Sequence, residues 1–235
     1  GFVIGVSGGI DSALTSTLCA KTGLPTLCLE MPIHQEKNQQ NRSLLHMQWL
    51  KKNFKNIQTK SVELTQVFDT FQQVVQDDVS EEKKMLSLAN ARARMRMTTL
   101  YYYAGVHNFL VAGTGNKVED FGVGFYTKYG DGGVDLSPIA DLLKSEVYDL
   151  GTALEVPESI LTAAPSDGLF GDSRSDEDQI GASYPELEWA MNAIENGKTA
   201  NDFEGRERTV IEIYLRYNSA NKHKMNPIPV CKIPE

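Results

Sequence analysis

The chain has 235 residues, of which 41% are hydrophobic and 23% are charged, a balance typical of globular domains rather than of disordered or collagen-like chains. Lysine and arginine total 23 against 31 aspartate and glutamate residues, and the net charge of −8 argues against a general nucleic-acid binder, because phosphate backbones require basic surface. The sequence shows neither an apolar run long enough to span a membrane nor a signal peptide, and its three cysteines form no Cys-x-x-Cys pair, so we expect a cytoplasmic protein with buried thiols.

Short apolar runs alternate with amphipathic segments through the first half of the chain. Apolar residues at steps of three and four mark the amphipathic segments as helices, and the β-branched runs between them are typical of buried strands. Strand and helix in alternation predict a doubly wound parallel sheet with helices on both faces, in a single domain over residues 1–235. The expected strands are 2–6, 26–31, 57–62 and 109–112, and the expected helices are 13–20, 38–54, 64–75 and 81–108.

The second half is less regular. Residues 113–135 are rich in glycine and exceed the length of an ordinary connection, which favours a functional loop. We expect helices over 141–155, 184–196 and 202–220. A polar, glycine-rich flap is expected at about 165–178, and a tail that covers the substrate is expected over residues 221–235.

The strongest local motif lies between the first strand and the first helix and reads Ser7-Gly8-Gly9-Ile10-Asp11-Ser12. Unpaired N–H groups at the start of a helix favour an anion, and the two glycines permit close approach of a ligand. Neither the Walker A pattern nor the Gly-x-Gly-x-x-Gly fingerprint is present. Asp11 would repel a phosphate unless a cation lay between them, and Mg²⁺ suits that position because it shares phosphate oxygens with few protein carboxylates.

This motif resembles the Ser-Gly-Gly-x-Asp-Ser loop of the N-type ATP pyrophosphatases, which activate a carboxylate or carbonyl as an adenylate. A second stretch, Gly124-Phe125-Tyr126-Thr127-Lys128-Tyr129-Gly130-Asp131-Gly132-Gly133, is similar to NAD synthetases within that superfamily. Asn90 to Met97 resembles the arginine helix of the same family, and the resemblance extends from Gly1 to about Lys224. It implies the α/β fold of the adenine nucleotide alpha hydrolases and a homodimer.

The resemblance also implies the site residues. Asp11 and Glu119 would hold Mg²⁺, while Asp11, Lys144 and Asp135 are the expected catalytic residues, with Asp135 placed near the attacking ammonia. The residues expected to bind deamido-NAD are Arg94, Lys128, Asp135, His223 and Lys224. The residues expected to bind ATP are Gly5, Val6, Ser7, Gly8, Gly9, Ile10, Asp11, Ser12, Thr114, Lys144 and Ser166.

The implied reaction is the ATP-dependent amidation of deamido-NAD to NAD. Glutamine-dependent relatives carry a large extra domain with its own catalytic cysteine, for which 235 residues leave no room, so direct use of ammonia is expected. A separate glutaminase chain is the other possible source of nitrogen. Two alternatives to the reaction are another synthetase of the superfamily, such as a GMP synthetase core, and a nucleotide-binding module without catalysis.

Three positions carry narrower expectations. Glu30 ends the second strand where some relatives have a basic residue, and it would accept a hydrogen bond from a ribose hydroxyl or from the adenine amino group. Arg92 and Arg94 fall on opposite flanks of their helix, so they are expected to face different neighbours.

Overall fold

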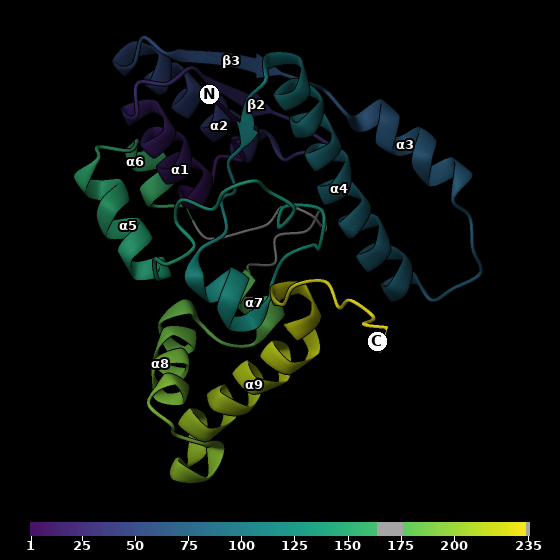
Figure 1. Ribbon diagram of the computed structural model, residues 1–235, viewed down its shortest axis with the longest axis vertical. Helices are drawn as coiled ribbons and strands as arrows, with labels where there is room; N and C mark the ends of the chain where they lie inside the picture. The colour runs from purple at the N-terminus through teal and green to yellow at the C-terminus, as the bar shows by residue number, and fades with distance from the viewer. Residues whose placement is uncertain (164–175, 234–235) are drawn as a thin grey trace.

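The computed structural model describes residues 1–163 and 176–233, and its centre is a four-stranded parallel sheet (Figure 1). The strand order is β3-β2-β1-β4, with Phe2 of β1 opposite both Thr26 of β2 and Leu110 of β4. All four expected strands are confirmed, although β4 is shorter than expected. The strands are β1 (Phe2–Gly5), β2 (Thr26–Glu30), β3 (Ile57–Ser61) and β4 (Leu110–Val111).

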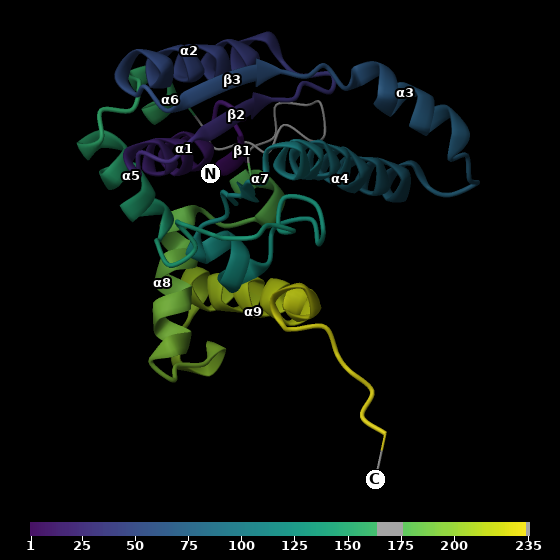
Figure 2. The same ribbon diagram turned by 45° about the horizontal axis from the view of Figure 1, so that its top comes forward.

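Helices cover both faces of this sheet, as Figure 2 shows from a second direction. One face packs Ile4 and Cys28 against α1 and α2, and the other packs Val3 and Leu29 against α3 and α4. This arrangement confirms the doubly wound α/β fold. The four helices are α1 (Ile10–Lys21), α2 (Lys37–Asn53), α3 (Thr65–Val74) and α4 (Glu81–His107).

The second half of the chain adds a helical layer beyond the sheet, in which α8 and α9 lie beside each other (Figure 1). Buried apolar side chains of η1, α8 and α9 form a core of their own, which includes Val118, Leu187 and Ile211. Within the described residues, no helix is both long and apolar enough to cross a membrane. The elements are η1 (Val118–Val123), α5 (Lys144–Ala153), α6 (Glu158–Leu161), α7 (Asp176–Ile180), α8 (Tyr184–Glu195), η2 (Ala200–Asp202) and α9 (Gly205–Met225).

Three features of this half differ from the sequence-based expectation. The glycine-rich loop contains the π-helix η1, which no periodicity in the sequence indicates. Helix α9 continues to Met225 rather than ending at residue 220, so His223 and Lys224 lie in its last turn. Residues 226–233 extend away from the body of the molecule instead of folding back over it (Figure 2).

Candidate functional site

The loop between β1 and α1 is held in shape by its own polar groups. The Ser12 hydroxyl accepts from the Ser7 backbone N–H at 3.1 Å and donates to the Gly9 carbonyl at 3.0 Å. Gly8 has φ of +86°, and a Cβ there would lie 2.5 Å from the Gln39 carbonyl of α2. Only glycine accommodates both the positive φ and the nearby carbonyl. The loop leads directly into α1, where backbone N–H groups at the start of the helix favour an anion.

Three charged side chains that are distant in sequence meet beside this loop. The Lys144 ammonium lies 2.6 Å from Asp11 Oδ2 and 3.1 Å from Glu119 Oε1. Lys144 is buried, and burial alone would lower its pKa. The charges and hydrogen bonds of the two carboxylates outweigh that effect and hold the pKa above its ordinary value.

Asn116 connects the Asp11 carboxylate to the backbone of the turn that carries Glu119, and it was not anticipated from the sequence. Its side-chain amide donates to Asp11 Oδ1 at 3.0 Å, and its Oδ1 accepts from the backbone N–H groups of Val118 and Glu119, both at 3.1 Å. Asn116 is fully buried and closes the start of the π-helix. A single amide thus ties Asp11 to the turn that carries Glu119. π-Helical turns often occur at functional sites.

A second acidic residue of the π-helix also faces this region. Asp120 packs so closely on Gly115 that a Cβ there would lie 2.1 Å from a carboxylate oxygen. Burial, followed by the charges of Glu119, Asp131 and Asp11, raises the pKa of Asp120 to about 7. The centre therefore carries more negative charge than Lys144 alone can balance.

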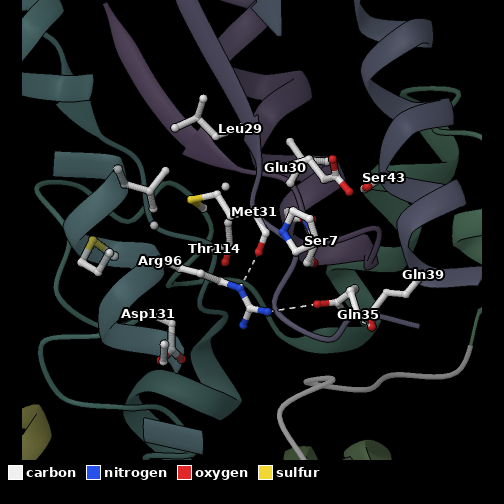
Figure 3. A pocket seen from close by; sticks show the side chains of 18 of the residues that line it. Ser7, Leu29, Glu30, Met31, Gln35, Gln39, Ser43, Arg96, Thr114 and Asp131 are labelled. Atoms are coloured by element: carbon white, nitrogen blue, oxygen red, sulfur yellow. Dashed lines mark hydrogen bonds between the residues drawn. The ribbon is translucent and has the colours of Figure 1, made fainter. Parts of the chain in front are cut away.

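A cavity of about 240 Å³ opens next to the loop, at the carboxyl ends of the strands (Figure 3). Arg96 reaches it from α4 and donates to the Met31 carbonyl and to Gln35 Oε1, both at 3.0 Å. Glu30 is 4% exposed, and Ser61 donates to its Oε2 at 2.5 Å. Its Oε1 is buried without a hydrogen-bond partner in the described part of the chain, which marks it as an acceptor without a donor. Other lining residues are Gly5, Val6, Ser7, Ser12 and Thr114.

The cations expected for a second substrate form a separate group at the end of α9. Arg94 donates to the Lys128 carbonyl at 3.3 Å, and the Lys128 ammonium donates to the His223 carbonyl at 2.5 Å. Lys224 donates to the Tyr126 carbonyl at 2.6 Å, and burial lowers its pKa. The structure therefore brings together four of the five residues expected to bind deamido-NAD, all but Asp135.

Asp135 lies between α4 and β4, and its side-chain hydrogen bonds within the described residues join it to neither group. Tyr101 donates to its Oδ1 at 2.9 Å, and the backbone N–H of Val111 donates to its Oδ2 at 2.8 Å. Both oxygens therefore already accept a hydrogen bond. Ser166 and most of the expected flap lie outside the described residues.

Arg92 and Arg94 of α4 face different neighbours, as expected. The Arg92 guanidinium lies 4.6 Å from the centre of the Phe68 ring, whereas Arg94 faces Lys128. Arg92 therefore contributes to the packing of α3 against α4, and Arg94 belongs to the cationic group.

Comparison with known proteins gives a consistent result. The sequence model of a family described as NAD synthase matches residues 1–228. An NH(3)-dependent NAD(+) synthetase of Carboxydothermus hydrogenoformans is 33% identical over 98% of this chain and 89% of its own length. The structure of an NMN synthetase from Francisella tularensis has a TM-score of 0.83 and 33% identity, covering 99% of this chain and 90% of that one. An NH3-dependent NAD synthetase from Campylobacter jejuni, in complex with the nitrate ion, has a TM-score of 0.77 and 28% identity, covering 99% and 89%.

Proposed function

The chain belongs to the NAD synthase family, and from that premise we propose that it amidates deamido-NAD to NAD with ammonia and ATP, releasing pyrophosphate and AMP. It is a ligase that forms a carbon–nitrogen bond. The observation that carries the site assignment is the meeting of Asp11, Glu119 and Lys144 beside an anion-binding loop. Neither a GMP synthetase core nor a module without catalysis is favoured by the family match.

We propose that ATP lies across the loop and the adjoining cavity. Backbone N–H groups at residues 7–12 and the Lys144 ammonium would hold the pyrophosphate portion, and Thr114 and Glu30 would contact the adenosine portion. The lining of the cavity by these last two side chains supports this orientation. Ser166 is retained as a proposed ATP contact, with Gly5, Val6 and Ile10 supplying backbone to the same region.

The two carboxylates fit Mg²⁺. Asp11 and Glu119 offer carboxylate oxygens as metal ligands. Both already lie within 3.1 Å of one cation, the Lys144 ammonium, so a second cation could share them. The described residues include no group of three or more side chains able to hold a metal by themselves. Mg²⁺ needs no such cage, because it is commonly bound through one or two carboxylates together with substrate phosphates. When bound, it would neutralise negative charge that develops on the leaving pyrophosphate.

The second substrate is proposed to lie on the cationic group of Arg94, Lys128, His223 and Lys224. Its nicotinate carboxylate attacks the α-phosphorus of ATP, and the bond between the α- and β-phosphates breaks to release pyrophosphate. Ammonia then attacks the acyl carbonyl, a proton is lost from its nitrogen, and AMP leaves with the electrons of the broken carbon–oxygen bond. Residues of this chain contribute by position and charge rather than by a covalent intermediate. The role of Asp135 near the ammonia remains a prediction, since its oxygens already accept from Tyr101 and Val111.

A second compound could accept the adenylate from ATP in place of deamido-NAD. The Francisella tularensis structure is that of an NMN synthetase, and NMN carries the same nicotinamide group as NAD. The acid form of the mononucleotide would present the same carboxylate to ATP while lacking the adenylate half. It is therefore the second candidate acceptor.

Pyrophosphate release from ATP and Mg²⁺ tests these proposals. Deamido-NAD, the acid mononucleotide or neither is supplied, with ammonium or glutamine as the nitrogen source. Release that requires deamido-NAD, with NAD formed only when ammonium is present, is the expected result. Release with the mononucleotide at higher kcat/KM would reassign the acceptor, and release that ignores both would refute the proposed function.

We further propose a homodimer in the cytoplasm. Apolar side chains on α3 and α4, including Val67, Val74, Tyr102 and Val106, are more than half exposed, and a second copy would cover them. The thiols of Cys19 and Cys28 are buried and unpaired, as is usual in a reducing compartment. Light scattering during gel filtration would measure the mass, and a monomer would contradict the first proposal.

A further inference from the structure

Tyr184 contacts Glu119 and Lys144, two of the three charged side chains that meet beside the loop. Its hydroxyl donates to Glu119 Oε1 at 2.5 Å, and the Lys144 ammonium lies 4.6 Å from the centre of its ring. The side chain is 4% exposed, so these contacts are shielded from water. No sequence motif singles out this tyrosine, which lies 65 residues from Glu119 and follows the expected flap.

The position of Tyr184 is fixed by contacts around the start of α8. Ser183 and Glu186 form a capping box, and Glu177 accepts from the Tyr184 backbone N–H at 2.8 Å. Arg206 of α9 donates twice to Glu186, each time at 2.7 Å. With its backbone held and its ring buried, the tyrosine presents its hydroxyl in one direction.

The Tyr184 hydroxyl shares one oxygen of Glu119 with the Lys144 ammonium. Within the described chain, the side-chain hydrogen bonds to Glu119 come from Tyr184 and Lys144, and both end on Oε1. A carboxylate held through one oxygen loses its freedom to rotate while the other oxygen keeps its lone pairs for a further ligand. Groups that orient a metal ligand in this way typically change metal affinity or activity 10–100-fold when removed.

We propose that Tyr184 is a positioning residue for the adenylation step, which holds Glu119 ready to ligate Mg²⁺ and keeps the Lys144 ammonium beside it through its ring. This inference rests on the proposed function, because it requires Glu119 to be a ligand of the metal that accompanies ATP. The contribution of the hydroxyl is separate from that of the ring: the first orients a carboxylate, and the second stabilises a buried cation. The two can therefore be tested one at a time.

Tyr184→Phe removes the hydroxyl and keeps the ring, and Tyr217→Phe is its matched control. Tyr217 of α9 is also partly buried and donates one hydrogen bond, to the Gln179 carbonyl at 3.1 Å, away from the charged centre. Each variant loses a tyrosine hydroxyl that donates a hydrogen bond, so a merely structural role predicts similar losses of thermal stability and no change in Mg²⁺ dependence. Calorimetric titration of ATP over a series of Mg²⁺ concentrations, without the second substrate, gives the Mg²⁺ concentration for half-maximal ATP affinity.

We expect Tyr184→Phe to raise this Mg²⁺ concentration by roughly tenfold, at the lower end of the range for such groups, while Tyr217→Phe leaves it within twofold. In steady-state assays at saturating Mg²⁺, the KM for deamido-NAD should stay within twofold in both variants. If Tyr184→Phe and the unmodified chain need the same Mg²⁺ concentration for half-maximal ATP affinity, this proposal is overturned and the proposed function stays intact. An unmodified chain whose ATP affinity ignores Mg²⁺ would overturn the metal assignment and this proposal together.

Discussion

Replacing Lys144 by methionine tests the charged centre most directly. The change keeps the approximate length of the side chain but removes the ammonium that lies 2.6 Å from Asp11 and 3.1 Å from Glu119. Removing one partner of a buried ion pair typically costs about 3–5 kcal/mol, because it leaves uncompensated charge. The two carboxylates are 19% and 17% exposed, so the lower value, about 3 kcal/mol, is the better expectation. For a chain of this size, that corresponds to a fall in Tm of roughly 6–12 °C.

The same reasoning predicts an unusual response to divalent cations. In Lys144→Met, a bound Mg²⁺ would supply the positive charge that the lysine no longer provides. Thermal unfolding with and without millimolar Mg²⁺ should therefore show a larger increase in Tm for the variant than for the unmodified chain. Pyrophosphate release should fall about 10²–10³-fold even at saturating Mg²⁺, the loss expected when one preorganised electrostatic contact to the transition state is removed.

Lys117→Met is the control for this experiment. Its ammonium lies 3.6 Å from Glu195, and the two side chains are 29% and 54% exposed, so its removal should cost less than about 1 kcal/mol. A Lys144→Met protein that unfolds within about 2 °C of the unmodified chain, and responds to Mg²⁺ no more than Lys117→Met, would refute the argument.

Three further changes probe separate parts of the molecule. Burial lowers the pKa of His46 from 6.5 to about 4, so between these pH values the unfolded chain binds a proton that the folded chain does not. The free energy of unfolding, measured with urea, should therefore fall as the pH is lowered through this window, by up to about 1.4 kcal/mol per pH unit. His46→Gln should flatten this pH profile. Glu30→Gln should weaken ATP binding by roughly tenfold in calorimetry while leaving the KM for deamido-NAD unchanged, because it removes a charged acceptor from the cavity; equal ATP affinity would exclude the contact. Asp11→Asn should nearly abolish pyrophosphate release by removing charge that compensates Mg²⁺, and near-normal release would contradict its assignment as a ligand.

The sheet and the loop that begins α1 were predictable because their signals are local. The runs that became β1 and β2 are short, mainly apolar and bounded by turn residues, and the glycines of the loop follow the first run directly. Parallel strands align their carboxyl ends at one edge of the sheet, which is why Asp11 and Glu119 could be expected to lie close together. The two flanks of α4 followed from helical periodicity alone, and the contacts of Arg92 and Arg94 agree with it.

The parts that escaped prediction depend on contacts between distant segments. The π-helix has no periodicity of its own, and its start is stabilised by Asn116, whose side chain also reaches a residue 105 positions earlier. Helix α9 passes its expected end because Asn221 and Lys224 donate to the carbonyls of Val123 and Gly124, which stabilise its last turn against the loop. Asp135 was placed near the ammonia by resemblance, whereas its nearest partners are Tyr101 and Val111.

The distribution of charge explains how an acidic chain could bind two polyanions. The centre beside the loop has an excess of carboxylates, and the pKa of Asp120 is raised to about 7 partly because Glu119 and Asp11 lie near it. Such a centre repels a triphosphate until a divalent cation enters, whereas Lys128 and Lys224 offer positive charge without any metal. We therefore expect Mg²⁺ to be required for one substrate only, and high salt to weaken the binding of the other first, because partly exposed cations are screened more than the buried Lys144 pair.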